Sequence, residues 1–187
     1  MKKFLMIAVM AMSALSMSAQ DSKFAAGINA DFIAASGSYT TAGFGLKLQY
    51  NFTEAFRTEL GYTYYLNKNE NGIWAINLNF AYLFKVSEKF KVGPMAGLGM
   101  NSTHMSSDLK DALQALEPNY EVKNTMALGF QFGVASEYQV SDHFKLGLDL
   151  MYKHAKKDPK YDESAKWVKY GVDTKGFLAS LTAAYCF

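Results

Sequence analysis

The chain has 187 residues, half of them hydrophobic, with 19 basic and 17 acidic side chains. Lys2 and Lys3 account for the excess of positive charge, so the rest of the chain is formally neutral and nucleic acid is not an expected partner. The single cysteine, Cys186, excludes an internal disulfide framework, and the three histidines are too scattered to predict a metal site. We therefore expect no metal and no cofactor.

The amino terminus is typical of a secretory signal peptide. A positively charged start is followed by an uncharged apolar run over residues 4–15 and by small residues that end at Ala19. We predict a cleaved signal over 1–19 and a single domain over 20–187. Beyond the signal, no apolar run is long enough for a membrane-spanning helix, which excludes a helical membrane protein.

Eight segments of the remaining chain alternate apolar or aromatic residues with glycine, small or polar residues. This period of two predicts β-strands with two different faces. In chain order the segments cover residues 24–34, 42–52, 56–64, 74–85, 90–101, 126–139, 144–153 and 177–187.

The connections between these segments alternate in length. Residues 53–55, 87–89 and 141–143 form short polar turns, whereas the longer connections cover 35–40, 67–72, 102–124 and 155–175. Short turns on one rim and longer loops on the other are typical of a transmembrane barrel. The pattern predicts an all-β fold, an eight-stranded antiparallel up-and-down β-barrel with the apolar face toward lipid.

Aromatic residues gather at both ends of the segments, as expected for two belts at the membrane interfaces. The belt on the turn side comprises Tyr50, Phe52, Phe84, Phe90, Tyr138 and Phe144. The belt on the loop side comprises Tyr62, Tyr64, Trp74 and Tyr152.

Charged residues on the opposite face predict a charge network inside the barrel. The expected members are Asp31, Lys47, Arg57, Glu59, Lys91, Glu137, Lys145 and Asp149. Lys47 and Glu59 lie on neighbouring strands within one pairing step, and Glu137 and Lys145 flank the turn at Ser141 in a similar way. Such side chains could select ions or small solutes. Because side chains roughly fill an eight-stranded barrel, they could instead pair and close the lumen.

A soluble eight-stranded barrel with an apolar ligand inside would also alternate, but its apolar face would point inward. Its outer face would then meet water and carry many long charged side chains. Here the less apolar face is mostly Gly, Ala, Asn and Gln, which suits a narrow interior. The sequence therefore favours the membrane barrel over the soluble carrier.

Three features of the longer connections could carry a function. Asp108, with the leucines that follow it, predicts a short amphipathic helix that acts as a lid, as a partner-binding or interfacial element, or as a shield over the barrel mouth. His104 and Ser106 have the spacing of the His and Ser of lipid A deacylases of barrel form, but no acid stands at the matching place and we favour coincidence. His154, with the lysines around it, could contact lipopolysaccharide phosphates or only solvate the loop.

The chain resembles the small eight-stranded outer-membrane barrels, the OmpX-like and OmpA-transmembrane-domain-like family. The likeness is carried by the signal that ends at Ala19, by the eight alternating segments and by the closing run 183–187. It implies a location in the outer membrane of a Gram-negative bacterium. It also implies that Tyr185 and Phe187 are read by the barrel-assembly machinery. Ala19 followed by Gln20 resembles signals common in Bacteroidetes.

We expect a monomeric, non-enzymatic barrel that contacts outer-membrane lipid and lipopolysaccharide. Its expected role is structural or interactive, with an extracellular partner bound through the loops over 102–124 and 155–175. A narrow porin-like channel and a lipid A modifying enzyme are the alternatives.

Overall fold

The computed structural model describes residues 23–35, 40–66, 72–104, 121–158, 160–162, 167–169 and 172–187. In this part of the chain the residues form strands, turns and bends, and none belongs to a helix with the length and hydropathy of a membrane span. The predicted signal over 1–19 and the predicted amphipathic helix at Asp108 lie outside the described residues.

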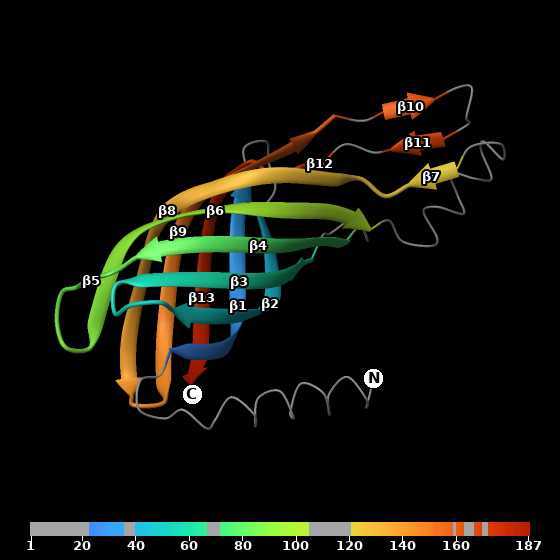
Figure 1. The fold of residues 1–187 in the computed structure, drawn as a ribbon. Helices are drawn as coiled ribbons and strands as arrows, with labels where there is room; N and C mark the ends of the chain where they lie inside the picture. The colour runs from blue at the N-terminus through green and yellow to red at the C-terminus, as the bar shows by residue number, and fades with distance from the viewer. Residues whose placement is uncertain are drawn as a thin grey trace, which may run out of the picture.

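Eight long strands form the main sheet of the described chain. They are β1 (Phe24–Ala35), β2 (Thr40–Asn51), β3 (Phe56–Tyr65), β4 (Gly72–Tyr82), β6 (Phe90–His104), β8 (Met126–Ser141), β9 (Phe144–Lys157) and β13 (Gly176–Cys186). Each pairs antiparallel with its neighbours in chain order, and β13 also pairs with β1. The sheet therefore closes on itself, and the predicted eight-stranded antiparallel barrel is confirmed (Figure 1).

The alternation of side chains decides which face of each strand turns inward. In β3, Leu60, Tyr62 and Tyr64 are exposed on the outer face, whereas Arg57 and Glu59 are buried on the inner face. In β13 the pattern repeats over the whole strand. Because successive side chains of a strand point to opposite faces, one register is enough to place every residue. The predicted faces of the strands are confirmed.

Glycines on the inner face let neighbouring strands approach closely. A Cβ atom built on Gly45 would lie 1.9 Å from the carbonyl oxygen of Tyr62, and one built on Gly133 would lie 2.0 Å from that of Leu150. Any larger residue would push these strand pairs apart. The close approach is consistent with the strong coiling that a small barrel requires, and Figure 1 shows strands of opposite walls crossing in projection.

Short hydrogen-bonded turns join the strands at one end of the barrel, as predicted. Thr53 Oγ1 accepts hydrogen bonds from the backbone amides of Ala55 at 3.3 Å and Phe56 at 2.9 Å. Ser87 Oγ accepts one from the amide of Phe90 at 3.1 Å. The two-residue strand β5 (Phe84–Lys85) pairs with β6 and extends this second hairpin.

The longer connections contain more strand than the sequence predicted. Strand β6 continues to His104 and β9 to Lys157, so the boundaries at 102 and 155 were placed too early. The two connections also contain the short strands β7 (Glu121–Lys123), β10 (Lys160–Asp162), β11 (Trp167–Lys169) and β12 (Val172–Asp173). The alternation was too short in these strands to be recognised as a strand pattern.

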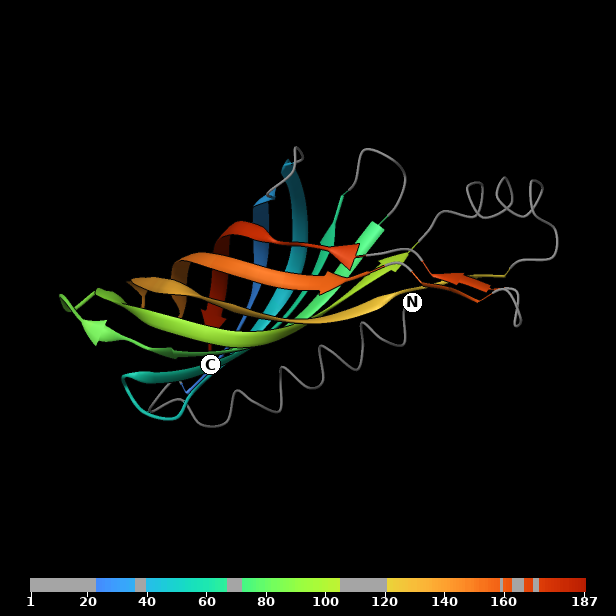
Figure 2. The ribbon, with the colours of Figure 1, turned by 90° about the horizontal axis from the view of Figure 1, so that it is seen from above.

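Segments from two different loops meet beyond the barrel. Strand β11 pairs antiparallel with β10 and parallel with β7, which gives a three-stranded sheet. Figures 1 and 2 show these three strands at the loop end, outside the barrel wall. The connection that follows β6 and the connection that follows β9 therefore form one structural unit through their backbones.

Candidate functional site: the charged lumen

Six of the buried charged side chains form a cluster in the lumen, into which they project from four strands. They are Lys47 on β2, Arg57 and Glu59 on β3, Glu137 on β8, and Lys145 and Asp149 on β9. Each occupies an inward position of its strand, where the sequence analysis placed it. Because β2 and β3 lie opposite β8 and β9 in the closed sheet, the groups of these two walls can meet each other only across the lumen.

Lys47 makes one of these connections across the barrel. Its ammonium nitrogen donates to Asp149 Oδ2 at 2.7 Å and lies 3.2 Å from Glu59 Oε1. Gly61 pairs with Lys47 on the neighbouring strand, and a Cβ atom there would lie 3.8 Å from Lys47 Cγ. A methyl group at Gly61 would therefore only touch the lysine chain, whereas a longer side chain would compete with it for space in the lumen.

Arg57 makes the second connection. Its Nη1 donates to Glu137 Oε2 at 2.9 Å, while Nη2 lies 3.7 Å from Glu59 Oε2 and 3.8 Å from Asp149 Oδ1. Lys145 then donates to the same Glu137 oxygen at 2.8 Å. The six side chains thus form one continuous network of three cations and three carboxylates, with no net charge.

Neutral amides complete the surroundings of Glu59, which is 1% exposed. Gln49 Nε2 donates to its Oε2 at 2.9 Å, and Asn79 Nδ2 donates to its Oε1 at 3.2 Å. Gln131 in turn donates to the carbonyl oxygen of the Asn79 side chain. A buried carboxylate needs such partners for each oxygen, and these hydrogen bonds extend the network to the wall formed by β4 and β8.

Asp31 lies apart from this network and is held by neutral donors. Ser180 Oγ donates to its Oδ1 at 2.6 Å and Asn29 Nδ2 donates to the same atom at 2.7 Å. Thr63 Oγ1 at 2.9 Å and the Tyr65 hydroxyl at 3.1 Å donate to its Oδ2. Four hydrogen bonds therefore satisfy the Asp31 carboxylate without a cation in contact.

Lys153 also projects into the lumen and is 1% exposed. It lies closer to the loop end of β9 than Asp149 of the charge network. Its ammonium nitrogen donates to Asn77 Oδ1 at 3.3 Å and lies 5.6 Å from the centroid of the Tyr65 ring. No carboxylate of the described residues lies within ion-pair distance of Lys153. Tyr65 thus contacts Lys153 with its ring and Asp31 with its hydroxyl, and links the two charges through one side chain.

The inner face also carries apolar residues, which corrects the expectation of a polar lumen. Ile33, Tyr65, Ile73, Met151 and Leu178 belong to one cluster of buried side chains. Tyr65 was not recognised as an inward residue because it follows the outward Tyr64, so aromatic character did not distinguish the two faces. The lumen is filled by apolar packing as well as by charge.

Lys91, the remaining predicted member of the network, lies at the rim. Its side chain is only half-buried, and its ammonium nitrogen donates to the backbone carbonyl of Glu54 at 3.1 Å. Although Lys91 pairs in register with Glu137, it therefore contributes to the turn beside it more than to the buried network.

The aromatic residues predicted for the two belts lie on the outer face. Most are exposed, whereas Trp74, Phe90 and Tyr152 are half-buried. On the turn side the aromatic rings form a chain of contacts. The centroid of the Phe24 ring lies 6.4 Å from those of Tyr50 and Phe187. Tyr185 lies 5.2 Å from Phe187. The interfacial role of the belts and the assembly role of Tyr185 and Phe187 stay predictions.

The possible catalytic pair is incomplete in the described chain. The sequence analysis placed His104 in a long connection. In the structure the backbone of His104 pairs with Gly72, so His104 is the last residue of strand β6. Ser106 is outside the described residues. Among the residues that are described, no group of three His, Cys, Asp or Glu side chains could hold a metal ion. The absence of a cofactor stays a prediction.

A model of the outer membrane protein β-barrel domain matches residues 4–183 of the sequence. The chain belongs to this family. It is thus an integral β-barrel protein of the bacterial outer membrane, in agreement with its closed sheet and apolar outer face. A search of curated proteins finds no match.

Solved structures of small outer-membrane proteins share the fold. Neisserial surface protein A (NspA) is 17% identical, with a TM-score of 0.52 over 87% of this chain and 95% of that one. OprG from Pseudomonas aeruginosa is also 17% identical, with a TM-score of 0.52 over 88% and 95%. Ail of Yersinia pestis, in complex with the heparin analogue sucrose octasulfate, is 15% identical, with a TM-score of 0.52 over 88% and 96%.

Proposed function

We propose that this protein is a monomeric, non-catalytic outer-membrane barrel whose lumen is closed and whose loops act at the cell surface. The observation that carries the proposal is the buried charge network. Two of its ion pairs, Lys47 with Asp149 and Arg57 with Glu137, join strands on opposite walls. An ion that crosses the barrel would have to displace these pairs in a medium of low dielectric constant.

The surface role falls to the loops around 102–124 and 155–175. Their short strands β7 and β11 pair with each other, which supports a shared and ordered surface rather than two independent loops. A partner outside the cell would bind there. The same proposal includes export by the signal over 1–19, its cleavage after Ala19, and insertion by the barrel-assembly machinery through Tyr185 and Phe187.

Planar-bilayer recordings test the closed lumen. We expect the refolded wild-type barrel to show no steady conductance. The double variant Arg57→Ala with Glu137→Ala removes one connection across the lumen and should conduct ions. A matched variant, Lys89→Ala with Glu88→Ala, removes two charges from an exposed turn and should stay closed. Steady ion-selective conductance of the wild-type barrel would contradict the proposal.

A narrow ion channel is the second candidate function. It is favoured by buried lumen atoms that have no hydrogen-bond partner, among them both polar atoms of the Asn101 side chain and Oε1 of Gln131. Buried polar atoms of this kind are usually satisfied by water. The same recordings separate the two functions, because a water-filled path would conduct without any substitution.

A further inference from the structure

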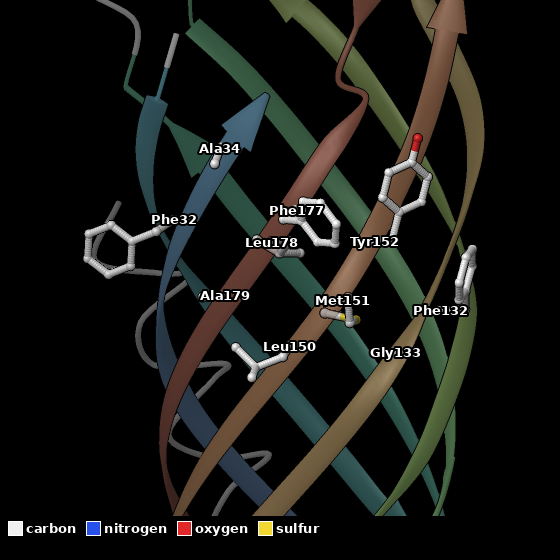
Figure 3. Close-up of a pocket in the computed structure, with 10 residues that line it drawn as sticks. All are labelled: Phe32, Ala34, Phe132, Gly133, Leu150, Met151, Tyr152, Phe177, Leu178 and Ala179. Carbon is white, nitrogen blue, oxygen red and sulfur yellow. The ribbon is translucent and has the colours of Figure 1, made fainter. Parts of the chain in front are cut away.

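An apolar groove of about 600 Å³ lies on the lipid-facing side of the barrel. It spans the four neighbouring strands β1, β13, β9 and β8, and none of its lining residues is charged. Figure 3 shows Phe32 on one side of the groove and Phe132 on the other, with Phe177 and Tyr152 between them. A second apolar hollow, of about 500 Å³, lies over β3, β4, β6 and β8.

The strand register explains the hollow. Ala179 on β13 pairs with Phe32 on β1 and with Leu150 on β9, so a methyl group lies between two large side chains. In the next row toward the loops, Phe177 pairs with Ala34 and with Tyr152. Small and large outward residues thus alternate along β13 and near the loop end of β1. The width left between Phe32 and Leu150 suits an extended hydrocarbon chain.

Basic residues lie directly above this groove, on the loop side. His154 follows Tyr152 on the outer face of β9, and its ring lies 5.3 Å from that of Phe130. Gly176 pairs with Lys153, so the preceding residue, Lys175, comes level with His154. Lys175 and Lys156 are exposed. Two residues of a strand span roughly 7 Å, so the basic row begins about 7 Å further along the strands than the aromatic row.

The vertical order of these rows matches the order of groups in an anionic lipid. Hydrocarbon would meet Ala179 and Leu150, the interface would meet Phe177 and Tyr152, and a phosphate would meet His154 and Lys175. The groove lies near the loop ends of β1 and β13, and therefore on the side of the outer leaflet. The phosphorylated lipid of that leaflet in a Gram-negative outer membrane is lipid A.

We propose that this groove binds an acyl chain of lipid A, with a phosphate of the same lipid beside His154 and Lys175. The proposal rests on the placement of the barrel in the outer membrane and does not depend on a closed lumen. Since the acyl chains of other lipids are as apolar as those of lipid A, the preference for lipid A comes from the phosphate beside His154 and Lys175.

Native mass spectrometry of the detergent-solubilised barrel with added lipid A tests this site. Ala179→Leu fills the groove from the outer face and should weaken lipid A binding about fivefold or more. Lys175→Gln removes one cation and should weaken it about fivefold, the effect of about 1 kcal/mol per basic residue near a charged membrane surface. The matched control is Ala183→Leu, an outward residue of the same strand near the turns, which should bind like the wild type.

Two comparisons can overturn the proposal. Equal binding by the Ala179→Leu and Ala183→Leu variants would show that lipid A contacts the barrel only as bulk lipid. Equal binding of lipid A, its dephosphorylated form and phosphatidylglycerol by the wild type would show that no phosphorylated glycolipid is recognised. Far-ultraviolet circular dichroism of each variant confirms that the barrel is folded. A wild-type barrel that conducts ions would leave these results unaffected, because the groove lies outside the lumen.

Discussion

The lumen holds its charges in two different ways. Around Glu59, carboxylates and cations touch, and each of the six charged groups has at least one partner of opposite sign. Around Asp31, hydroxyls and an amide satisfy the carboxylate, while Lys153 contacts an amide oxygen and an aromatic ring. The first region depends on pairs of charges, whereas the second separates its two charges by Tyr65. Loss of one charge should therefore have very different consequences in the two regions.

The largest effect is expected for Glu59→Met. This change leaves Lys47 and Arg57 short of a buried partner and should lower the free energy of unfolding by about 3–5 kcal/mol. Urea unfolding of the refolded barrel in lipid vesicles measures it. Adding Lys47→Met in the same chain should recover part of the lost stability, because it removes one of the two buried cations that have lost Glu59 as a partner. A loss below about 1 kcal/mol for the single variant would show that the network is not tightly coupled.

A smaller effect is expected for Tyr65→Phe. The change removes only the hydroxyl that donates to Asp31 at 3.1 Å and keeps the ring that lies against Lys153. Loss of a hydrogen bond to a charged group should cost about 1.5–3 kcal/mol of unfolding free energy. Tyr62→Phe, on the exposed outer face, is the matched control and should stay within about 0.5 kcal/mol of the wild type.

The smallest effect is expected for Lys153→Met, which sharpens the comparison most directly. The new side chain keeps much of the length of lysine and removes a buried ammonium that has no described carboxylate partner. Because a buried charge without such a partner carries a desolvation cost, stability should change by less than about 1 kcal/mol or increase. Lys47→Met, at an ion-paired position, should instead cost about 3–5 kcal/mol. Similar losses for both lysines in urea unfolding would remove the distinction between the two regions.

The sequence was sufficient to predict the fold and the local part of the charge network. The alternation with a period of two assigns each residue of a strand to one face of the sheet. The inward positions of Lys47 and Glu59 could therefore be predicted from the sequence alone. Their proximity, and that of Glu137 to Lys145, followed because each pair flanks a short turn. These predictions depend only on neighbouring strands.

The contacts across the lumen could not be predicted in the same way. Lys47 and Asp149 are 102 residues apart, and Arg57 and Glu137 are 80 apart. Which residues of opposite walls share a level depends on the tilt and stagger of all eight strands, which no local pattern contains. The inward position of Tyr65 was missed for a different reason. Tyr64 and Tyr65 are successive residues of the same type, so apolar and polar residues do not alternate there.

The pairing of β1 with β13 runs from Ala25 opposite Cys186 to Ala35 opposite Gly176. This is the seam of the cylinder, and it joins strands that lie at opposite ends of the described chain. Until the last strand arrives, both edges of the growing sheet expose unpaired backbone groups, which hydrocarbon cannot satisfy. The cylinder therefore has no stable half-built form in the bilayer. Its strands must be sheltered until the final one is in place, and the slow step of assembly should be the closing of this seam.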